Sequence, residues 1–263
     1  AAEGRGNGMM SYFIAGGNAG MAFVPLVLVA FLEKLSLNAL PLLILPAALM
    51  ALLFIRSGLC AVSSLPEHPA AERPKLTRIL FARTTITLNL AMGLRCWTHG
   101  AFGTFLPLLL VGNGEDTSAA GLFLTIFMVG GMMGGLFGGN LADKFTGRGI
   151  IVTFLVFGIL PCAYYFTHVS ADVLGGIVLF AAGFALMAPQ PSSIIWAQQA
   201  LPENAGMASG MMLGMSFGLG SLGVAATAAL GDVVGLAPAL LISVLALPLA
   251  ALLAYITPEP QTK

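Results

Sequence analysis

Arg95 and His99 are the residues of this sequence whose chemistry is most informative, because the residues around them are almost all apolar. A guanidinium holds a phosphonate or carboxylate through two parallel hydrogen bonds, and an imidazole gains and loses a proton near neutral pH. Their i, i+4 spacing places both side chains on one face of a helix. We therefore expect Arg95 to anchor an anionic solute and His99 to bind the solute or carry protons. The alternatives are an arginine bonded to backbone carbonyls at a helix break and a neutral histidine bonded to a neighbouring carbonyl.

Three amide side chains, those of Asn18, Asn89 and Gln190, also fall within segments that are otherwise apolar. Such amides can line a solute cavity, and we include all three among the candidate binding residues. The alternative is a hydrogen bond between helices, which often contributes only about 0.6 kcal/mol. Gln190 lies between Pro189 and Pro191, where a helix should kink and free a carbonyl group.

The segment from Asp143 to Arg148 is a candidate gate, with charges at Asp143, Lys144 and Arg148. Asp143 can accept hydrogen bonds from a helix N-terminus or a basic partner in one state of a transporter and release them in the other. The alternative is a solvated loop whose lysine and arginine only set the orientation in the membrane.

Glycines spaced four residues apart form ladders in two apolar segments. Such ladders let a second helix approach closely. One segment carries two of them, Gly130-Gly134-Gly138 and Gly131-Gly135-Gly139, and the other carries Gly206-Gly210-Gly214-Gly218. We expect the helix with Gly16 and Gly20 to serve one ladder, whereas the other has no glycine-bearing partner in this chain.

The composition shows where these residues must reside. Of 263 residues, 58% are apolar and 8% are charged, against about 25% charged residues in soluble domains. This excludes a soluble enzyme, a nucleic-acid-binding protein and a disordered chain. The three cysteines show no metal-ligand spacing, so we expect neither a metal nor a cofactor. The sequence predicts an all-α, polytopic membrane protein whose surroundings are a lipid bilayer.

Charge-free runs of about 20 residues divide the chain into membrane-spanning helices. They predict eight, near 11–32, 37–56, 84–110, 118–140, 149–168, 173–197, 205–230 and 236–256. With the N-terminus in the cytoplasm, nine Lys and Arg residues fall inside and only Lys34 falls outside. Both termini are therefore expected to be cytoplasmic.

The loop sequence GNLADKFTGR at 139–148 resembles the cytoplasmic signature of the major facilitator superfamily. Four further segments resemble one branch of it, the fosmidomycin resistance family of bacterial exporters. They are GGNAG at 16–20 with Pro25, Leu94-Arg95, TFLP at 104–107, and GMASG at 206–210 continuing to Gly214, Gly218 and Gly220. The resemblance covers nearly the whole chain in the right order.

The resemblance implies that the eight helices correspond to helices 5–12 of a twelve-helix fold. Residues 1–58 would then be the last two helices of the N-terminal half, and the Pro- and charge-rich residues 59–79 the central cytoplasmic linker. Residues 80–258 would form the six-helix C-terminal half and residues 259–263 a cytoplasmic tail. The chain begins with Ala1-Ala2-Glu3 rather than Met, and we expect four helices to precede it. One of them would face the ladder that begins at Gly206.

The expected function is a secondary transporter of the bacterial inner membrane that exports a small, anionic, drug-like solute and so confers antibiotic resistance. Proton coupling stays open, because no Asp or Glu lies within a span and the candidates are Asp232 or the preceding helices. A second hypothesis is a non-transporting membrane module, or an eight-helix remnant that docks to another subunit. An intramembrane serine protease is disfavoured, since GMASG has one residue too many for that motif and no paired aspartates are present.

Overall fold

The computed structural model describes residues 6–35, 41–57 and 83–259, and every regular element in these ranges is helical. In chain order the elements are α1 Gly6–Leu35, α2 Ile44–Arg56, α4 Arg83–Gly112, α5 Thr117–Ala142, α6 Gly147–Thr167, α7 Val173–Met187, α8 Pro189–Ala200, η3 Pro202–Asn204, α9 Ala205–Val234, α10 Leu236–Val244 and α11 Ala246–Ile256. Most of these helices match the predicted segments to within a few residues, but α2 begins seven residues later than predicted, and two segments are each divided in two. The expected linker at 59–79 lies outside the described residues, and so does the tail at 259–263 apart from Glu259.

Proline explains both divisions. Pro189 and Pro191 follow the turn at Ala188 that separates α7 from α8, and Pro248 follows the break at Leu245 between α10 and α11. A proline lacks the N–H that would bond the carbonyl four residues earlier, and its ring crowds that carbonyl. The predicted kink at Gln190 is therefore a break between two helices, α7 and α8, whereas the break at Leu245 was not predicted.

Five of the described segments are long and apolar enough to cross a membrane. They are 117–142, 147–167, 173–200, 205–234 and 236–256. α4 has 30 residues, or about 45 Å at 1.5 Å per residue, but Asn89, Arg95 and His99 reduce its apolar character. The prediction of eight spanning helices is thus supported for five, and the remaining three stay a prediction.

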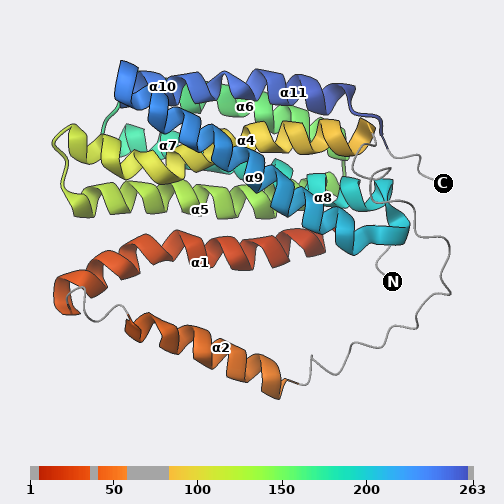
Figure 1. Ribbon diagram of the computed structural model, residues 1–263, viewed down its shortest axis with the longest axis horizontal. Coiled ribbons are helices and arrows are strands. Elements are labelled where there is room, and N and C mark those ends of the chain that lie inside the picture. The colour runs from red at the N-terminus through yellow and green to blue at the C-terminus, as the bar shows by residue number, and fades with distance from the viewer. Residues whose placement is uncertain (1–5, 36–40, 58–82, 260–263) are drawn as a thin grey trace.

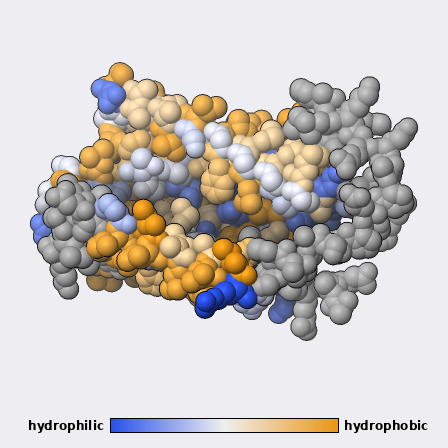
Figure 2. All heavy atoms as spheres, turned by 60° about the horizontal axis from the view of Figure 1, so that its bottom comes forward, coloured by the Kyte–Doolittle hydropathy of each residue, from blue (hydrophilic) through white to orange (hydrophobic). Residues whose placement is uncertain are grey.

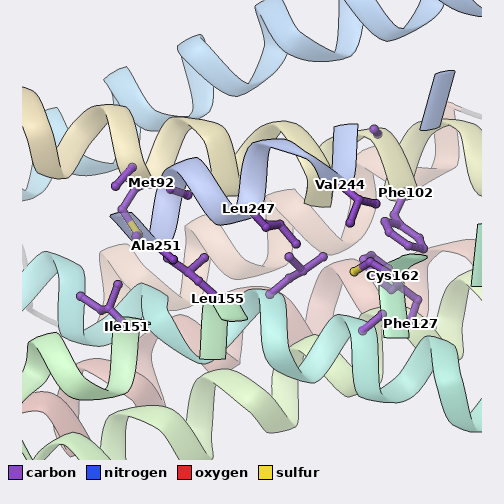
Figure 3. Close-up of a cluster of buried hydrophobic side chains, with 14 of the residues drawn as sticks. Met92, Phe102, Phe127, Ile151, Leu155, Cys162, Val244, Leu247 and Ala251 are labelled. Carbon is purple, nitrogen blue, oxygen red and sulfur yellow. The ribbon is translucent and has the colours of Figure 1, made fainter. Parts of the chain in front are cut away.

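The core of the bundle is built mainly from side chains of α4, α5, α6, α7, α8, α10 and α11, with smaller contributions from α1 and α9. Phe102 of α4 stacks on Phe127 of α5 with ring centroids 4.9 Å apart, and both side chains are fully buried. Cys162 and Val244 complete this end of the cluster, as Figure 3 shows. α9 lies along α4, and α7 packs between α5 and α6. The core therefore holds α4 against the broken segment formed by α7 and α8.

The first two helices are arranged differently. α1 lies along α5, whereas α2 has no buried residue and is drawn apart from the other helices in Figure 1. Apolar side chains cover most of the face seen in Figure 2. Large exposed apolar residues are found on almost every helix, which suits a surface in contact with lipid rather than water.

The glycine ladder at 130, 134 and 138 lies against α7 and not, as the sequence suggested, against α1. A methyl group on each of these glycines would overlap a backbone carbonyl oxygen of the facing segment, in order those of Phe180, Phe184 and Ala188. On α1, a methyl group on Gly16 or Gly20 would meet no atom within 4 Å. Without side chains on these α5 glycines, the two backbones come into direct contact.

The ladder on α9 is open. A methyl group on any of Gly206, Gly210, Gly214 and Gly218 would meet no described atom within 4 Å, and all four glycines are exposed. α9 contacts α4 through other glycines, because Gly220 lies against Cys96 and Gly223 against the ring of Trp97. One face of α9 is therefore packed and the face with the ladder is not.

Candidate functional site

The break between α7 and α8 is the centre of the candidate site. Pro189 and Pro191 lack the N–H groups that would bond the carbonyls of Ala185 and Met187, four residues earlier. The carbonyl between these two, that of Leu186, accepts a hydrogen bond from Nη1 of Arg95 at 2.7 Å. The proline pair predicted freed carbonyls in this part of the chain, but it did not predict the contact of Arg95 with Leu186.

Arg95 is a buried charge without a carboxylate partner among the described residues. Its side chain is 2% exposed. Nη1 lies 3.2 Å from Sδ of Met187, Nη2 lies 3.1 Å from Sγ of Cys96, and Nε has no hydrogen-bond partner. Sulfur is a weak acceptor, so the carbonyl of Leu186 is the one strong acceptor in contact. This geometry agrees with the alternative in which the arginine bonds a carbonyl at a helix break.

Asn18 approaches the same break from α1. Its Nδ2 and the carbonyl oxygen of Met187 each lie 3.9 Å from the point where a Cβ of Gly135 would be. Nδ2 of Asn18 and Oε1 of Gln190, at the start of α8, are both buried and have no hydrogen-bond partner in the part of the chain that the structure describes. Because Gly135 has no side chain, α1 and the α7–α8 break both approach α5 at this position. The structure thus brings Asn18, Arg95 and Gln190 together around one discontinuity.

His99 lies one turn beyond Arg95 on α4, outside this group. Its ring is half-buried and packs against Phe127, with ring centroids 5.3 Å apart. No hydrogen bond to its ring nitrogens is found among the described residues. Its surroundings are therefore those of a ring at the edge of the aromatic core.

Asn89 lies about two turns of α4 before Arg95, the residue that contacts the break. Its Nδ2 donates to the carbonyl of Thr85 at 2.9 Å, and its Oδ1 accepts from the hydroxyl of Ser216 on α9 at 3.4 Å. The space beside it amounts to about 10 Å³, which is too small for a solute. These contacts correspond to the alternative for the amides, a hydrogen bond between helices.

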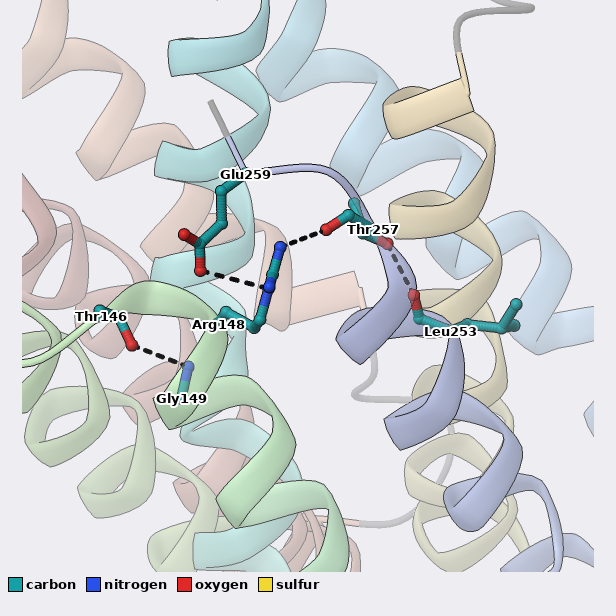
Figure 4. Close-up of polar contacts among 6 residues, drawn as sticks. All are labelled: Thr146, Arg148, Gly149, Leu253, Thr257 and Glu259. Carbon is teal, nitrogen blue, oxygen red and sulfur yellow. Dashed lines mark hydrogen bonds and ion pairs between the residues drawn. The ribbon is translucent and has the colours of Figure 1, made fainter. Parts of the chain in front are cut away.

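The expected gate residues lie where α5 ends and α6 begins, and Arg148 contacts residues more than 100 positions later in the chain (Figure 4). Its Nη2 donates to the carbonyl of Thr257 at 2.7 Å, and its Nε lies 3.2 Å from Oε1 of Glu259. The guanidinium also stands over the ring of Trp196, 5.9 Å from the centroid. The start of α6 is thereby joined to the residues that follow α11.

The other gate residues have local roles in this structure. Asp143 is the C-cap of α5, and the backbone N–H of Lys144 donates to the carbonyl of Leu141 at 3.0 Å. The hydroxyl of Thr146 caps α6 by accepting from the N–H of Gly149 at 3.2 Å. Sequence reasoning missed Thr257 and Glu259; its one available signal was an acidic residue directly after the last helix.

Comparisons with known proteins agree on one family. The model of the Major Facilitator Superfamily matches residues 2–225. The "Uncharacterized MFS-type transporter YfnC" of Bacillus subtilis (strain 168) is 30% identical over 95% of this chain, and the "Fosmidomycin resistance protein" of Escherichia coli (strain K12) is 25% identical over 88%. This chain spans 63% and 58% of the length of these two relatives.

Solved structures show the same fold. FucP, a transporter of this superfamily in the outward conformation, superposes with a TM-score of 0.75 at 17% identity, over 98% of this chain and 70% of that one. A second structure of FucP, the E. coli fucose:proton symporter, gives a TM-score of 0.66 at 19% identity, over 89% of this chain and 59% of that one.

Proposed function

Because this chain belongs to the Major Facilitator Superfamily, we propose that it acts in a secondary transporter that moves a small, anionic, drug-like solute across the membrane by alternating access. The proposed direction is efflux. The relationship to a fosmidomycin resistance protein supports efflux and a role in antibiotic resistance. In this family's architecture the solute binds near the bilayer midplane, between the two halves of the protein.

The observation that carries the proposal is the buried charge of Arg95. A charged group inside a membrane protein is expensive to bury unless it is paired, and it is functional by default. The described carboxylates leave Arg95 unpaired, and its Nε lacks any acceptor. An acidic solute would supply the missing negative charge and form charge-assisted hydrogen bonds stronger than the one to the Leu186 carbonyl.

Asn18 and Gln190 would complete the solute site. Among the described residues, the first offers an unpartnered amide donor from α1 and the second an unpartnered carbonyl acceptor from the start of α8. Because Arg95 holds the carbonyl of Leu186 in this structure, solute binding would exchange one partner of the guanidinium for another. The end of α7 would then lose a support, which gives solute binding a route to the break between α7 and α8.

The Arg148 contacts support a gating role for the region where α5 ends and α6 begins. The ion pair and the hydrogen bond to Thr257 tie α6 to the end of α11, and we propose that they change between the two states of the transporter. We propose that this end faces the cytoplasm of a bacterial inner membrane, because nine basic residues fall in the predicted inside segments. His99 and Asn89 remain candidate binding residues of lower structural support, and proton coupling remains a proposal.

The open face of α9 supports a further part of the proposal. We infer that it is covered by a helix from a longer form of the protein, in a twelve-helix arrangement with eight spans in this chain. The alternative is a non-transporting module, or an eight-helix remnant, whose open α9 face docks to another subunit. Transport by a form as long as the relatives, but not by residues 1–263 alone, would favour the first arrangement.

Susceptibility to fosmidomycin tests the transport function. A form as long as the relatives is expressed in a susceptible bacterial strain, and accumulation of the labelled drug is measured with Arg95→Ala, Arg95→Lys and Arg83→Gln. Losing a hydrogen bond to a charged group costs about 1.5–3 kcal/mol, so Arg95→Ala should weaken solute binding roughly 10- to 100-fold. Arg83→Gln, which removes a charge at the start of the same helix, is the matched control. Full protection by Arg95→Ala, at equal amounts in the membrane, would refute the role of Arg95.

A further inference from the structure

A second cavity lies at the end of the bundle where the loop between α5 and α6 meets the residues after α11. Its volume is about 290 Å³, close to the lower limit for sites that bind small ligands. Its walls combine two kinds of side chain. Arg148, Ser192 and Glu259 are polar, whereas Phe145, Ile195 and Trp196 present apolar surface. It lies apart from the α7–α8 break, and none of the residues assigned to the solute site lines it.

Two lining residues carry hydrogen-bond donors that have no partner among the described residues. Ser192 is 1% exposed and Trp196 is 3% exposed, and both the hydroxyl of the first and the indole N–H of the second are unpartnered. Buried donors are nearly always satisfied in native proteins, so each exception needs an explanation. The guanidinium of Arg148 lies beside the same indole ring. The two unpartnered atoms are themselves buried, so the guanidinium of Arg148 is the group through which this wall would hold a ligand that accepts hydrogen bonds.

A carboxylate already touches this wall. The carboxylate of Glu259 ends a short aliphatic side chain, and its Oε1 lies 3.2 Å from Nε of Arg148 (Figure 4). The Glu259 side chain is 50% exposed and that of Arg148 is 29% exposed. Ion pairs with this exposure contribute about 0–1 kcal/mol. A carboxylate that also gained apolar contacts could therefore displace Glu259.

We propose that this cavity is a binding site for a small carboxylate with an apolar body, and that Glu259 is its internal competitor. The ligand's carboxylate pairs with Arg148 in place of that of Glu259. Its apolar body lies against Phe145, Ile195 and Trp196. Binding releases residues 257–259 from the start of α6, which makes the site regulatory. The inference does not depend on transport, because it concerns binding to the chain alone.

Calorimetric titration of the purified protein in a non-ionic detergent tests this site with three probes. Benzoate has both the charge and the apolar body, benzamide has the body without the charge, and inorganic phosphate has charge without the body. Benzoate should bind saturably and more tightly than either of the others. Arg148→Gln should weaken benzoate binding at least about tenfold, because a charge-assisted hydrogen bond is lost. Arg148→Lys, which keeps the charge but not the forked geometry, should fall between.

The variant Glu259→Gln makes the sharpest distinction. Removing the internal competitor should tighten benzoate binding several-fold, an increase that a misfolded variant cannot produce. Arg83→Gln removes a charge that does not line the cavity and should leave the affinity unchanged. Weaker or unaltered binding to Glu259→Gln would overturn the proposal, and so would equal binding of benzamide, preferential binding of phosphate, or unaltered binding to Arg148→Gln.

Discussion

The glycine ladders of α5 and α9 have the same spacing but opposite surroundings. On α5, the positions that Cβ atoms would take at Gly130, Gly134 and Gly138 are occupied by backbone carbonyls of the facing helix. On α9, the corresponding positions at Gly206 to Gly218 are empty within the described part of the chain. Spacing alone therefore indicates that a helix can be approached closely, and it does not indicate which helix makes the approach.

The same contrast is found between the two faces of α9. α9 has a closed face, where Gly220 and Gly223 lie against α4, and an open face, where the ladder lies. The closed face is also fixed by the indole N–H of Trp97, which donates to the hydroxyl of Thr227 at 2.8 Å. The two faces of α9 can thus be tested against each other within one helix.

The largest expected effect comes from Gly134→Ala on α5. The added methyl would overlap the carbonyl oxygen of Phe184, and a backbone atom held in a packed helix cannot move aside as a side chain can. Overpacking typically costs 1–3 kcal/mol, and here we expect about 3 kcal/mol or more. Unfolding in detergent, followed by circular dichroism during SDS titration, measures the loss. A variant as stable as the wild type would show that α5 and α7 are less closely packed than the structure indicates.

A smaller effect is expected for Gly223→Ala on the closed face of α9. The methyl would overlap the ring of Trp97, which can rotate only by losing its hydrogen bond to Thr227. We expect a loss of about 1–3 kcal/mol in the free energy of unfolding. Gly218→Ala is the matched control, because it adds the same methyl to the same helix on the open face. Equal losses for the two variants would mean that the faces of α9 do not differ.

The pH dependence of stability tests the N-terminal cap of α7, the helix that packs against the glycine ladder of α5. Asp172 caps the N-terminus of α7, where its carboxylate accepts from the N–H of Gly175 at 2.7 Å and from the hydroxyl of Ser170 at 2.9 Å. These hydrogen bonds, that from Gly175 first, lower the pKa of Asp172. A lowered folded-state pKa contributes stability above the unfolded value, and this stability is lost as the pH falls through the folded pKa.

The change in stability below about pH 4 should therefore be smaller in Asp172→Asn than in the wild type. Unfolding measured from pH 7 to pH 3 gives both curves. Asn keeps a cap oxygen, so the fold should persist and only the pH-dependent part should change. Parallel curves would contradict the stabilising role of the ionised cap.

The contrast between the ladders also shows what the sequence could and could not specify. Local signals predicted the helices, the break beside Gln190 and the glycine ladders, because proline and glycine act within one turn of their own position. The contacts of Arg148 with Thr257 and of Arg95 with Leu186 join residues 109 and 91 positions apart. Such contacts depend on how whole helices pack, and a single sequence carries no direct signal for them.

The smallest effect in this chain, and the most informative one, is expected for Gly214→Ala. Its methyl would meet no described atom within 4 Å, so the cost should be near zero. The higher helix propensity of alanine could even add up to about 1 kcal/mol. A clear loss of stability in residues 1–263 would mean that the ladder face is packed within this chain.

The expected effect of Gly214→Ala on stability is different in a protein as long as the two relatives. If a helix of that form lies on the α9 ladder, Gly214→Ala should destabilise it by about 1–3 kcal/mol, as overpacking does elsewhere, while residues 1–263 remain unaffected. Unfolding of both forms, each with and without the substitution, measures this difference directly. An unchanged stability in the longer form would leave the ladder facing lipid or another subunit, and the module that docks through α9 would become the better explanation.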